Sequence, residues 1–160
     1  MKILHLFILA HIRTILVNIA SHSTNGKYIG IDPSRNYPIF TDYENAEILS
    51  LKPAAVDSRD VYIASYKTPG EVFDLKGNGK ELIMYKHNGQ YNQRFYLVKH
   101  PSNGYQIINQ GLCIQYMNST KDFKKKTCDG NPDQLFDFVR VEDNDEEEKN
   151  SYSESSYNRK

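Results

Sequence analysis

A repeated segment narrows the possible folds of this 160-residue chain more than any other feature of its sequence. Residues 17–26 align without a gap on residues 61–70, both beginning with Val and ending with Gly. Residues 105–111 form a looser third copy. Copies of about 42 residues at a nearly fixed period predict a repeat architecture in which each unit completes the core of its neighbour.

A second shared element lies later in each copy. Residues 133–136 (Asp-Gln-Leu-Phe) match residues 92–95 (Asn-Gln-Arg-Phe) and, weakly, residues 45–48 (Asn-Ala-Glu-Ile). The last residue of each element is apolar, and we interpret these three residues as core anchors: Ile48, Phe95 and Phe136. The two elements recur in the same order, which strengthens the repeat assignment.

Short apolar runs interrupted by turn signals predict strands between residues 28 and 141. Runs rich in Tyr, Ile, Val and Phe, such as residues 61–65, 81–85 and 94–98, are separated by Asn-Gly, Pro-Gly and Gly-Asn-Gly. No segment there shows the spacing of a helix. Many short strands with regular turns predict an all-β barrel or sandwich. Three units of roughly four strands each, closed on themselves, make a β-trefoil.

The Gln-x-Phe near the end of the second and third units resembles the Gln-x-Trp repeat of ricin B-type lectin domains. The resemblance covers residues 17–141, the β-trefoil domain. The chain is rich in Asn, Lys, Tyr and Ile and has no Trp, which is similar to the secreted ricin B-like lectins of microsporidia. The third unit ends near Val141 without its fourth strand, and residues 17–21 form an extra strand that closes the ring.

The two ends of the chain differ from the domain. Residues 1–16 begin with a basic residue and a short apolar run, which indicates a secretory signal peptide. Its cleavage site is left open as late as residue 21, and a buried cytosolic segment is the alternative reading. The repeat favours a cut before Val17. Residues 142–160 start with six acids in seven residues and continue with Ser and Tyr, which predicts a disordered tail.

The sequence contains no pattern that argues for catalysis. The 20 basic and 20 acidic residues balance, so the uniformly basic surface of a nucleic-acid binder is absent. The five His residues lack metal-ligand spacing, and no nucleotide-binding or nucleophile motif occurs. We interpret His87 as a packed side chain because its aligned positions hold Phe40 and Cys128. We therefore expect no enzymatic activity, no metal and no cofactor.

The family resemblance also implies a disulfide. Cys113 and Cys128 stand at the two positions that ricin B-type units join, and a secreted chain with two Cys residues most simply pairs them. Asn118 lies between them in an Asn-Ser-Thr sequon, a candidate for N-glycosylation.

Four positions of the second unit match the sugar site of ricin B-type lectins. A sugar needs polar side chains that hydrogen-bond its hydroxyls, beside an aromatic ring that stacks on its C–H face. The resemblance places an Asp two residues after the first Cys position, an aromatic two before the second, and Asn-Gln ahead of the anchor. These positions hold Asp74, Tyr85, Asn92 and Gln93.

The other two units do not match the family's site. The first unit offers Gly30, Pro38, Asn45 and Ala46, with no acid and no ring. The third offers Gln115, Lys126, Asp133 and Gln134, with Lys in the place of the ring. We therefore expect one competent site.

The resemblance implies a secreted, extracellular lectin that binds galactose or N-acetylgalactosamine on glycoproteins and serves in adhesion. Its partners would be glycans rather than nucleic acid, and the mature protein would have no membrane span. The alternative is a β-trefoil without sugar binding that acts as a structural or protein-interaction module, such as a coat component or a secreted effector. The fold alone does not decide between them.

Overall fold

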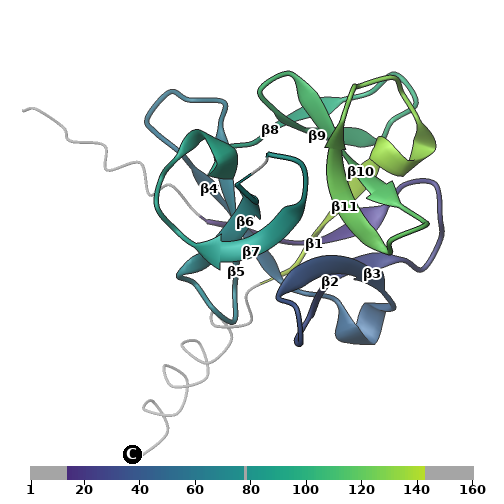
Figure 1. Ribbon diagram of the computed structural model, residues 1–160, viewed down its shortest axis with the longest axis horizontal. Helices are drawn as coiled ribbons and strands as arrows, with labels where there is room; N and C mark the ends of the chain where they lie inside the picture. Colours follow the sequence, from purple (N-terminus) through teal and green to yellow (C-terminus); the bar gives the residue numbers. More distant parts are fainter. Residues whose placement is uncertain (1–13, 78, 143–160) are drawn as a thin grey trace, which may run out of the picture.

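The structure is a computed structural model that describes residues 14–77 and 79–142. Most of the predicted signal peptide and nearly all of the predicted tail lie outside these residues. One order of elements occurs three times: three strands, a short 3-10 helix and a fourth strand (Figure 1). The first repeat contains β1 (Ile15–Ser21), β2 (Tyr28–Asp32), β3 (Tyr37–Thr41), η1 (Tyr43–Asn45) and β4 (Leu49–Pro53). The second contains β5 (Val61–Ser65), β6 (Glu71–Leu75), β7 (Leu82–Lys86), η2 (Tyr91–Gln93) and β8 (Tyr96–Lys99). The third contains β9 (Tyr105–Asn109), β10 (Leu112–Met117), β11 (Asp122–Lys126), η3 (Pro132–Gln134) and β12 (Phe136–Arg140).

The first and fourth strands of the repeats form a closed ring. The strands pair antiparallel in the order β1, β4, β5, β8, β9, β12 and back to β1, with a bridge between Val61 and Phe95 joining β5 to the start of β8. Closure leaves no open edge in the ring. The predicted all-β fold of three repeats, the β-trefoil, is confirmed.

The third repeat has its fourth strand, contrary to our sequence interpretation. β12 pairs with β1 over residues 136–140, directly before the acidic segment. The sequence did not predict this strand for two reasons. The core anchor Phe136 is its first residue, so little of the strand precedes the acidic segment. Its last residues, Val139 and Arg140, are exposed, as residues at the end of a domain often are. β1 is accordingly the regular first strand of its repeat, and it closes the ring as predicted.

Three hairpins lie around the centre of the molecule. Figure 1 shows them as β2–β3, β6–β7 and β10–β11. Backbone hydrogen bonds join them, from Met84 N to Asn36 O at 2.9 Å and from Lys125 N to Lys80 O at 2.7 Å. The hairpins of all three repeats therefore pack together as one layer.

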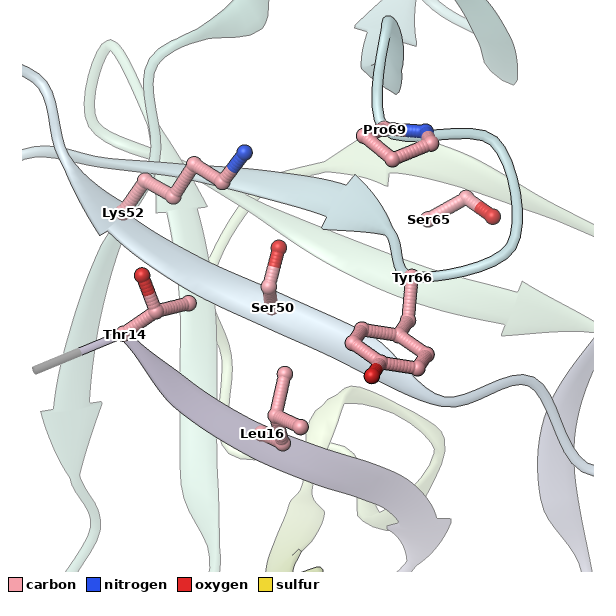
Figure 2. A pocket seen from close by; sticks show the side chains of 7 residues that line it. All are labelled: Thr14, Leu16, Ser50, Lys52, Ser65, Tyr66 and Pro69. Atoms are coloured by element: carbon pink, nitrogen blue, oxygen red, sulfur yellow. The ribbon is translucent and has the colours of Figure 1, made fainter. Parts of the chain in front are cut away.

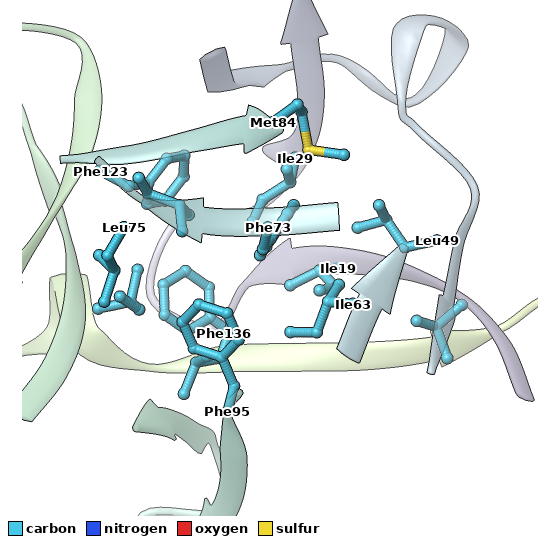
Figure 3. Close-up of a cluster of buried hydrophobic side chains, with 14 residues drawn as sticks. Ile19, Ile29, Leu49, Ile63, Phe73, Leu75, Met84, Phe95, Phe123 and Phe136 are labelled. Atoms are coloured by element: carbon cyan, nitrogen blue, oxygen red, sulfur yellow. The ribbon is translucent and has the colours of Figure 1, made fainter. Parts of the chain in front are cut away.

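The core is built from threefold-related side chains of ring and hairpins (Figure 3). Leu49, Phe95 and Phe136 are fully buried. They are equivalent, because the residue two positions after each pairs with Ile63 of β5, Ile107 of β9 or Ile19 of β1, respectively. The predicted anchor of the first repeat, Ile48, is wrong by one residue. Ile48 is only half-buried, because its side chain falls on the other side of the strand from Leu49.

The first aligned segment has the same local structure in two repeats. Ser21 ends β1 and its hydroxyl accepts a hydrogen bond from Thr24 N at 3.0 Å. Ser65 ends β5 and accepts one from Thr68 N at the same distance. The gap-free match of residues 17–26 with residues 61–70 therefore reflects one turn, capped by one hydroxyl.

The predicted disulfide is formed. Cys113 at the start of β10 and Cys128 after β11 are joined, with 15 residues of separation in the sequence. Asn118 lies in the turn between these two strands and is exposed, so its side chain is accessible to solvent.

The folded part of the chain starts before residue 17. Ile15 and Leu16 pair with Leu51 and Ser50 of β4, and Leu16 is buried. Both residues therefore belong to the sheet, although the sequence interpretation assigned them to the signal peptide.

Candidate functional site

The outer face of the second hairpin carries the acid and the ring singled out from the sequence. Asp74 lies on β6 and Tyr85 on β7, two positions apart along the ladder, with the pair Phe73–Met84 between them. Their strand neighbours Phe73 and Met84 point into the core, so Asp74 and Tyr85 share the opposite face. Asp74 is 3% exposed and Tyr85 is 55% exposed.

The amides of η2 hold the Asp74 carboxylate from both sides. Asn92 Nδ2 donates to Asp74 Oδ1 at 2.8 Å, and Gln93 Nε2 donates to Asp74 Oδ2 at 2.7 Å. Among the residues that the structure describes, no cation forms an ion pair with this carboxylate. Burial of a charge is unfavourable unless it is hydrogen-bonded, and the two amides supply one hydrogen bond to each oxygen.

Gln93 is a positioning residue in this arrangement. Its side chain is fully buried, and its amide also donates to Lys86 O at 3.0 Å. Its carbonyl accepts from Asn88 N and Gly89 N, which uses both acceptor sites. Gln93 therefore has no hydrogen-bonding capacity left for a ligand, and it acts by fixing Asp74.

Asn92, which is half-buried, and the buried Asp74 next to it both have hydrogen-bond acceptor sites that no described donor uses. Both amide hydrogens of Asn92 are engaged, by Asp74 and by Leu75 O at 3.3 Å. Within the described part of the chain, no donor contacts Asn92 Oδ1, and Asp74 accepts one hydrogen bond on each oxygen. Each of these oxygens has a second lone pair. The site is therefore suited to a ligand that donates hydrogen bonds, such as one with adjacent hydroxyls, next to an exposed ring.

His87 is not a buried core side chain, contrary to the sequence interpretation. It is exposed, and its ring centroid lies 4.5 Å from that of Tyr62 with the rings edge to face. The interpretation was wrong because the sequence alignment paired His87 with Phe40. Phe40 pairs with Ile29 in the first repeat, as Met84 pairs with Phe73 in the second, so Phe40 is the counterpart of Met84.

The third repeat keeps the link from helix to strand without the charge. Gln134 Nε2 donates to Gln115 Oε1 at 3.0 Å and to Thr127 O at 2.7 Å, and Gln134 is fully buried. The strand register places Lys126 opposite Cys113, as Tyr85 stands opposite Val72, so the predicted replacement of the ring by Lys is confirmed.

In the first repeat, neighbouring atoms occupy the space that the acidic side chain takes in the second repeat. The register places Thr41, not Pro38, in the position of Tyr85. A Cβ on Gly30 would lie 2.6 Å from Thr41 Cγ2 and 2.8 Å from Asn45 O, so no acidic side chain fits there. Counted back from Leu49, Ala46 and Glu47 stand at the offsets of Asn92 and Gln93, in place of the predicted Asn45 and Ala46. However, η1 ends four residues before Leu49 whereas η2 ends two residues before Phe95, so Glu47 lies outside the helix and is not the structural counterpart of Gln93.

Two hollows lie away from the Asp74 site, and neither was predicted from the sequence. The first, of about 250 Å³, is shown in Figure 2; we call it the junction pocket, and its lining residues are Thr14, Leu16, Ser50, Lys52, Ser65, Tyr66 and Pro69. The second, of about 320 Å³, is lined by Thr24, Lys27, Phe40, Tyr116, Asn118, Lys121 and Asp133. Each hollow is lined by residues that lie far apart in the sequence, so it can be predicted only when the pairing register of the strands is known.

Two further properties concern the described residues. Between residues 14 and 142, leaving out residue 78, no three His, Cys, Asp or Glu side chains gather as a metal site would require. In the same part of the chain, no helix has the length and apolar character to cross a membrane.

Comparison with known proteins supports the fold. No family model matches the sequence, and no curated protein is similar to it in sequence. Among solved structures, the chain is similar to ThreeFoil, a designed threefold-symmetric protein, with a TM-score of 0.67 and 15% identity over 79% of this chain and 99% of that one. A lectin of Polyporus squamosus, bound to the epitope Neu5Acα2-6Galβ1-4GlcNAc, gives a TM-score of 0.67 and 16% identity over 80% of this chain and 49% of that chain. The Haemophilus ducreyi cytolethal distending toxin gives 0.64 and 17% over 80% and 85%. The fold is therefore shared with lectins and with toxin subunits.

Proposed function

We propose that the protein is a secreted, non-enzymatic lectin that binds galactose-type glycans through the second repeat. Asp74 and Asn92 accept hydrogen bonds from sugar hydroxyls, and Tyr85 stacks on the C–H face of the ring. Gln93 holds Asp74 in place. The disulfide between Cys113 and Cys128 and the apolar N-terminal run support secretion.

The buried Asp74 carboxylate is the observation that carries this proposal. The third repeat makes the same link from helix to strand with neutral Gln115, so the link itself does not require a charge. A carboxylate at this position adds a charge that the link between helix and strand does not need. The fold alone therefore does not explain why an acid stands at position 74. Recognition of a ligand with hydroxyl groups does explain it. Tyr85 on the same face supplies the ring that a sugar needs.

A single shallow site of this kind binds weakly, with a Kd near 1 mM or about −4 kcal/mol. The full chain is therefore displayed on a multivalent support and tested on a glycan array, so that several contacts act together. We expect signal on terminal galactose or N-acetylgalactosamine that free galactose competes away.

Two variants test the site. Asp74→Asn removes the charge while keeping the shape, and we expect binding to fall about tenfold or more because a hydrogen bond to a charged group is lost. Asp133→Asn is the matched control in the third repeat and leaves binding unchanged. Full binding by a folded Asp74→Asn protein would disprove the site. A blank array with folded, oxidised protein would favour the protein-interaction module instead.

A further inference from the structure

The three repeats differ at one equivalent position on the outside of the ring. Ser50 on β4, Tyr96 on β8 and Asp137 on β12 each pair with the next-to-last residue of the following ring strand. Their neighbours along the strand enter the core, so these three side chains face outward. The position thus holds a small, a large aromatic and a charged residue in turn.

The junction between the third and first repeats is filled at this position. The His22 ring lies there, with Nδ1 2.8 Å from Asp137 Oδ1 and Nε2 3.1 Å from Ser102 O. A Cβ on Gly104 would lie 2.9 Å from His22 Cγ, so the ring is closely packed. At the junction of the second and third repeats, Tyr96 supplies a large side chain. Only Ser50 leaves space, and the junction pocket of about 250 Å³ lies over it.

Ser50 points its hydroxyl into the junction pocket. The residue is 4% exposed, and among the described residues every fully buried side-chain oxygen or nitrogen has a hydrogen-bond partner, whereas no partner contacts Ser50 Oγ, so this oxygen is open to the space of the pocket. Figure 2 shows this hydroxyl rising from the strand between the side chains of Lys52 and Tyr66. A hydroxyl that is open to the pocket can donate one hydrogen bond to, and accept hydrogen bonds from, a group that enters from outside.

The other lining residues define the charge and shape of that group. Lys52 is half-buried and, within the described residues, its ammonium has no ion pair, whereas the nearby Lys67 faces Glu47 at 3.9 Å. Tyr66 presents an aromatic ring and Leu16 an apolar floor. The pocket therefore offers one cation, hydroxyl groups and an apolar surface in a space for one small ring.

We propose that the junction pocket binds a carboxylate-bearing sugar, a hexuronate, as a second site with its own specificity. The Lys52 ammonium pairs with the carboxylate, Ser50 and Thr14 bond the ring hydroxyls, and Tyr66 packs on the C–H face. The Asp74 site presents a negative charge and acceptors, whereas the junction pocket presents a positive charge. The two sites therefore select ligands of different charge.

A pair of sugars that differ in one group tests the proposal. Methyl β-D-glucuronide and methyl β-D-glucoside are titrated into the isotope-labelled full chain and followed by amide NMR shifts, in a buffer without carboxylate or phosphate. We expect the glucuronide to shift the signals of Ser50, Lys52 and Tyr66, with affinity that weakens as salt rises. The glucoside, which lacks the charge, binds about tenfold more weakly or not at all.

Variants decide where the glucuronide binds. Ser50→Tyr fills the pocket with the side chain that the second repeat already carries at Tyr96, and Lys52→Met removes the cation while keeping the chain length; both abolish the shifts. Lys27→Met, in the second hollow, and Asp74→Asn leave them unchanged. If Ser50→Tyr does not fold, Lys52→Met carries the test alone. Equal binding of the two glycosides, shifts elsewhere, no shifts at about 10 mM sugar, or unchanged binding by Lys52→Met would each overturn the proposal. Because galactose binding is measured separately, failure here leaves the Asp74 site untouched.

Discussion

Gln93 Nε2 donates a 2.7 Å hydrogen bond to Asp74 Oδ2, and the two side chains join η2 to β6 beneath the surface of the second hairpin. The corresponding Gln134 reaches a neutral partner in the third repeat. In the first repeat, Glu47 lies after η1 and accepts from Ser65 Oγ of the second repeat at 2.6 Å. Among the described residues, only the second repeat therefore joins its 3-10 helix to its hairpin through a buried carboxylate.

Gln93→Leu is expected to lower the free energy of unfolding by about 2 to 3 kcal/mol, because the buried Asp74 oxygen and the Asn88 and Gly89 amides lose their partner. Tyr85→Ala, at an exposed ring, changes it by less than about 0.5 kcal/mol. Urea unfolding followed by circular dichroism gives both values. Equal effects of the two variants would contradict the assignment of Gln93 as a positioning residue.

Leu49→Ala is expected to cost about 3 kcal/mol of stability, since a fully buried side chain leaves a cavity. Ile48→Ala, one residue away and half-buried, is expected to cost about 1 kcal/mol or less. The same unfolding experiment compares them. A larger loss for Ile48→Ala would restore the register expected from the sequence.

The wrong assignment of Ile48, instead of Leu49, as the core anchor shows which features of the fold the sequence predicts and which it does not. The strands and their threefold order follow from spacing, because Ser21 and Ser65 close the same turn at the same offset. Ile48 and Leu49 are both large and apolar, so only the pairing of the strand distinguishes which one enters the core. The Asp74 cluster was predicted from residue types at fixed offsets. The junction pocket was not, since it depends on the size of Ser50 relative to residues in other repeats.

Removal of β1 is expected to prevent folding. A chain that starts at His22 loses the strand that pairs with both β4 and β12, together with the core residues Val17 and Ile19. Its ring would have two unpaired edges. A chain of residues 14–142 keeps β1 and is expected to fold. Amide NMR dispersion separates the two outcomes, and a well-dispersed spectrum from the chain starting at His22 would show that β1 does not close the ring.

Loss of the disulfide is expected to lower stability by about 3 kcal/mol, the chain-entropy estimate for a closed loop of about 15 residues. The variant is Cys113→Ala with Cys128→Ala, compared with the oxidised protein in urea. Because Cys113 is fully buried, part of the loss reflects its packing, and the reduced parent protein serves as the control that keeps both sulfur atoms. No difference between the oxidised and reduced parent would mean that the bridge does not constrain the unfolded chain.

The turn after β2 holds a carboxylate whose titration can be followed. The Ser34 hydroxyl at 2.7 Å and the Arg35 guanidinium at 2.8 Å hold the pKa of Asp32 well below its usual range. Because the pKa is lower in the folded state, Asp32 stabilises the fold above its unfolded pKa of about 3.9. That contribution is lost as the pH falls through the folded pKa.

Ser34→Ala removes the larger cause and is expected to raise the pKa of Asp32 toward its ordinary value. Carboxyl carbon NMR titration from neutral to acid measures it. Ser119→Ala, an exposed residue in the β10–β11 turn, is the control and leaves the Asp32 curve in place. An Asp32 curve that is the same in Ser34→Ala and in the parent protein would show that Arg35 and the backbone amides alone hold the charge. In that case the ion pair with Arg35 would be the main side-chain contact by which Asp32 stabilises the turn after β2. This role of Asp32 in the first repeat is separate from that of Asp74 in the second.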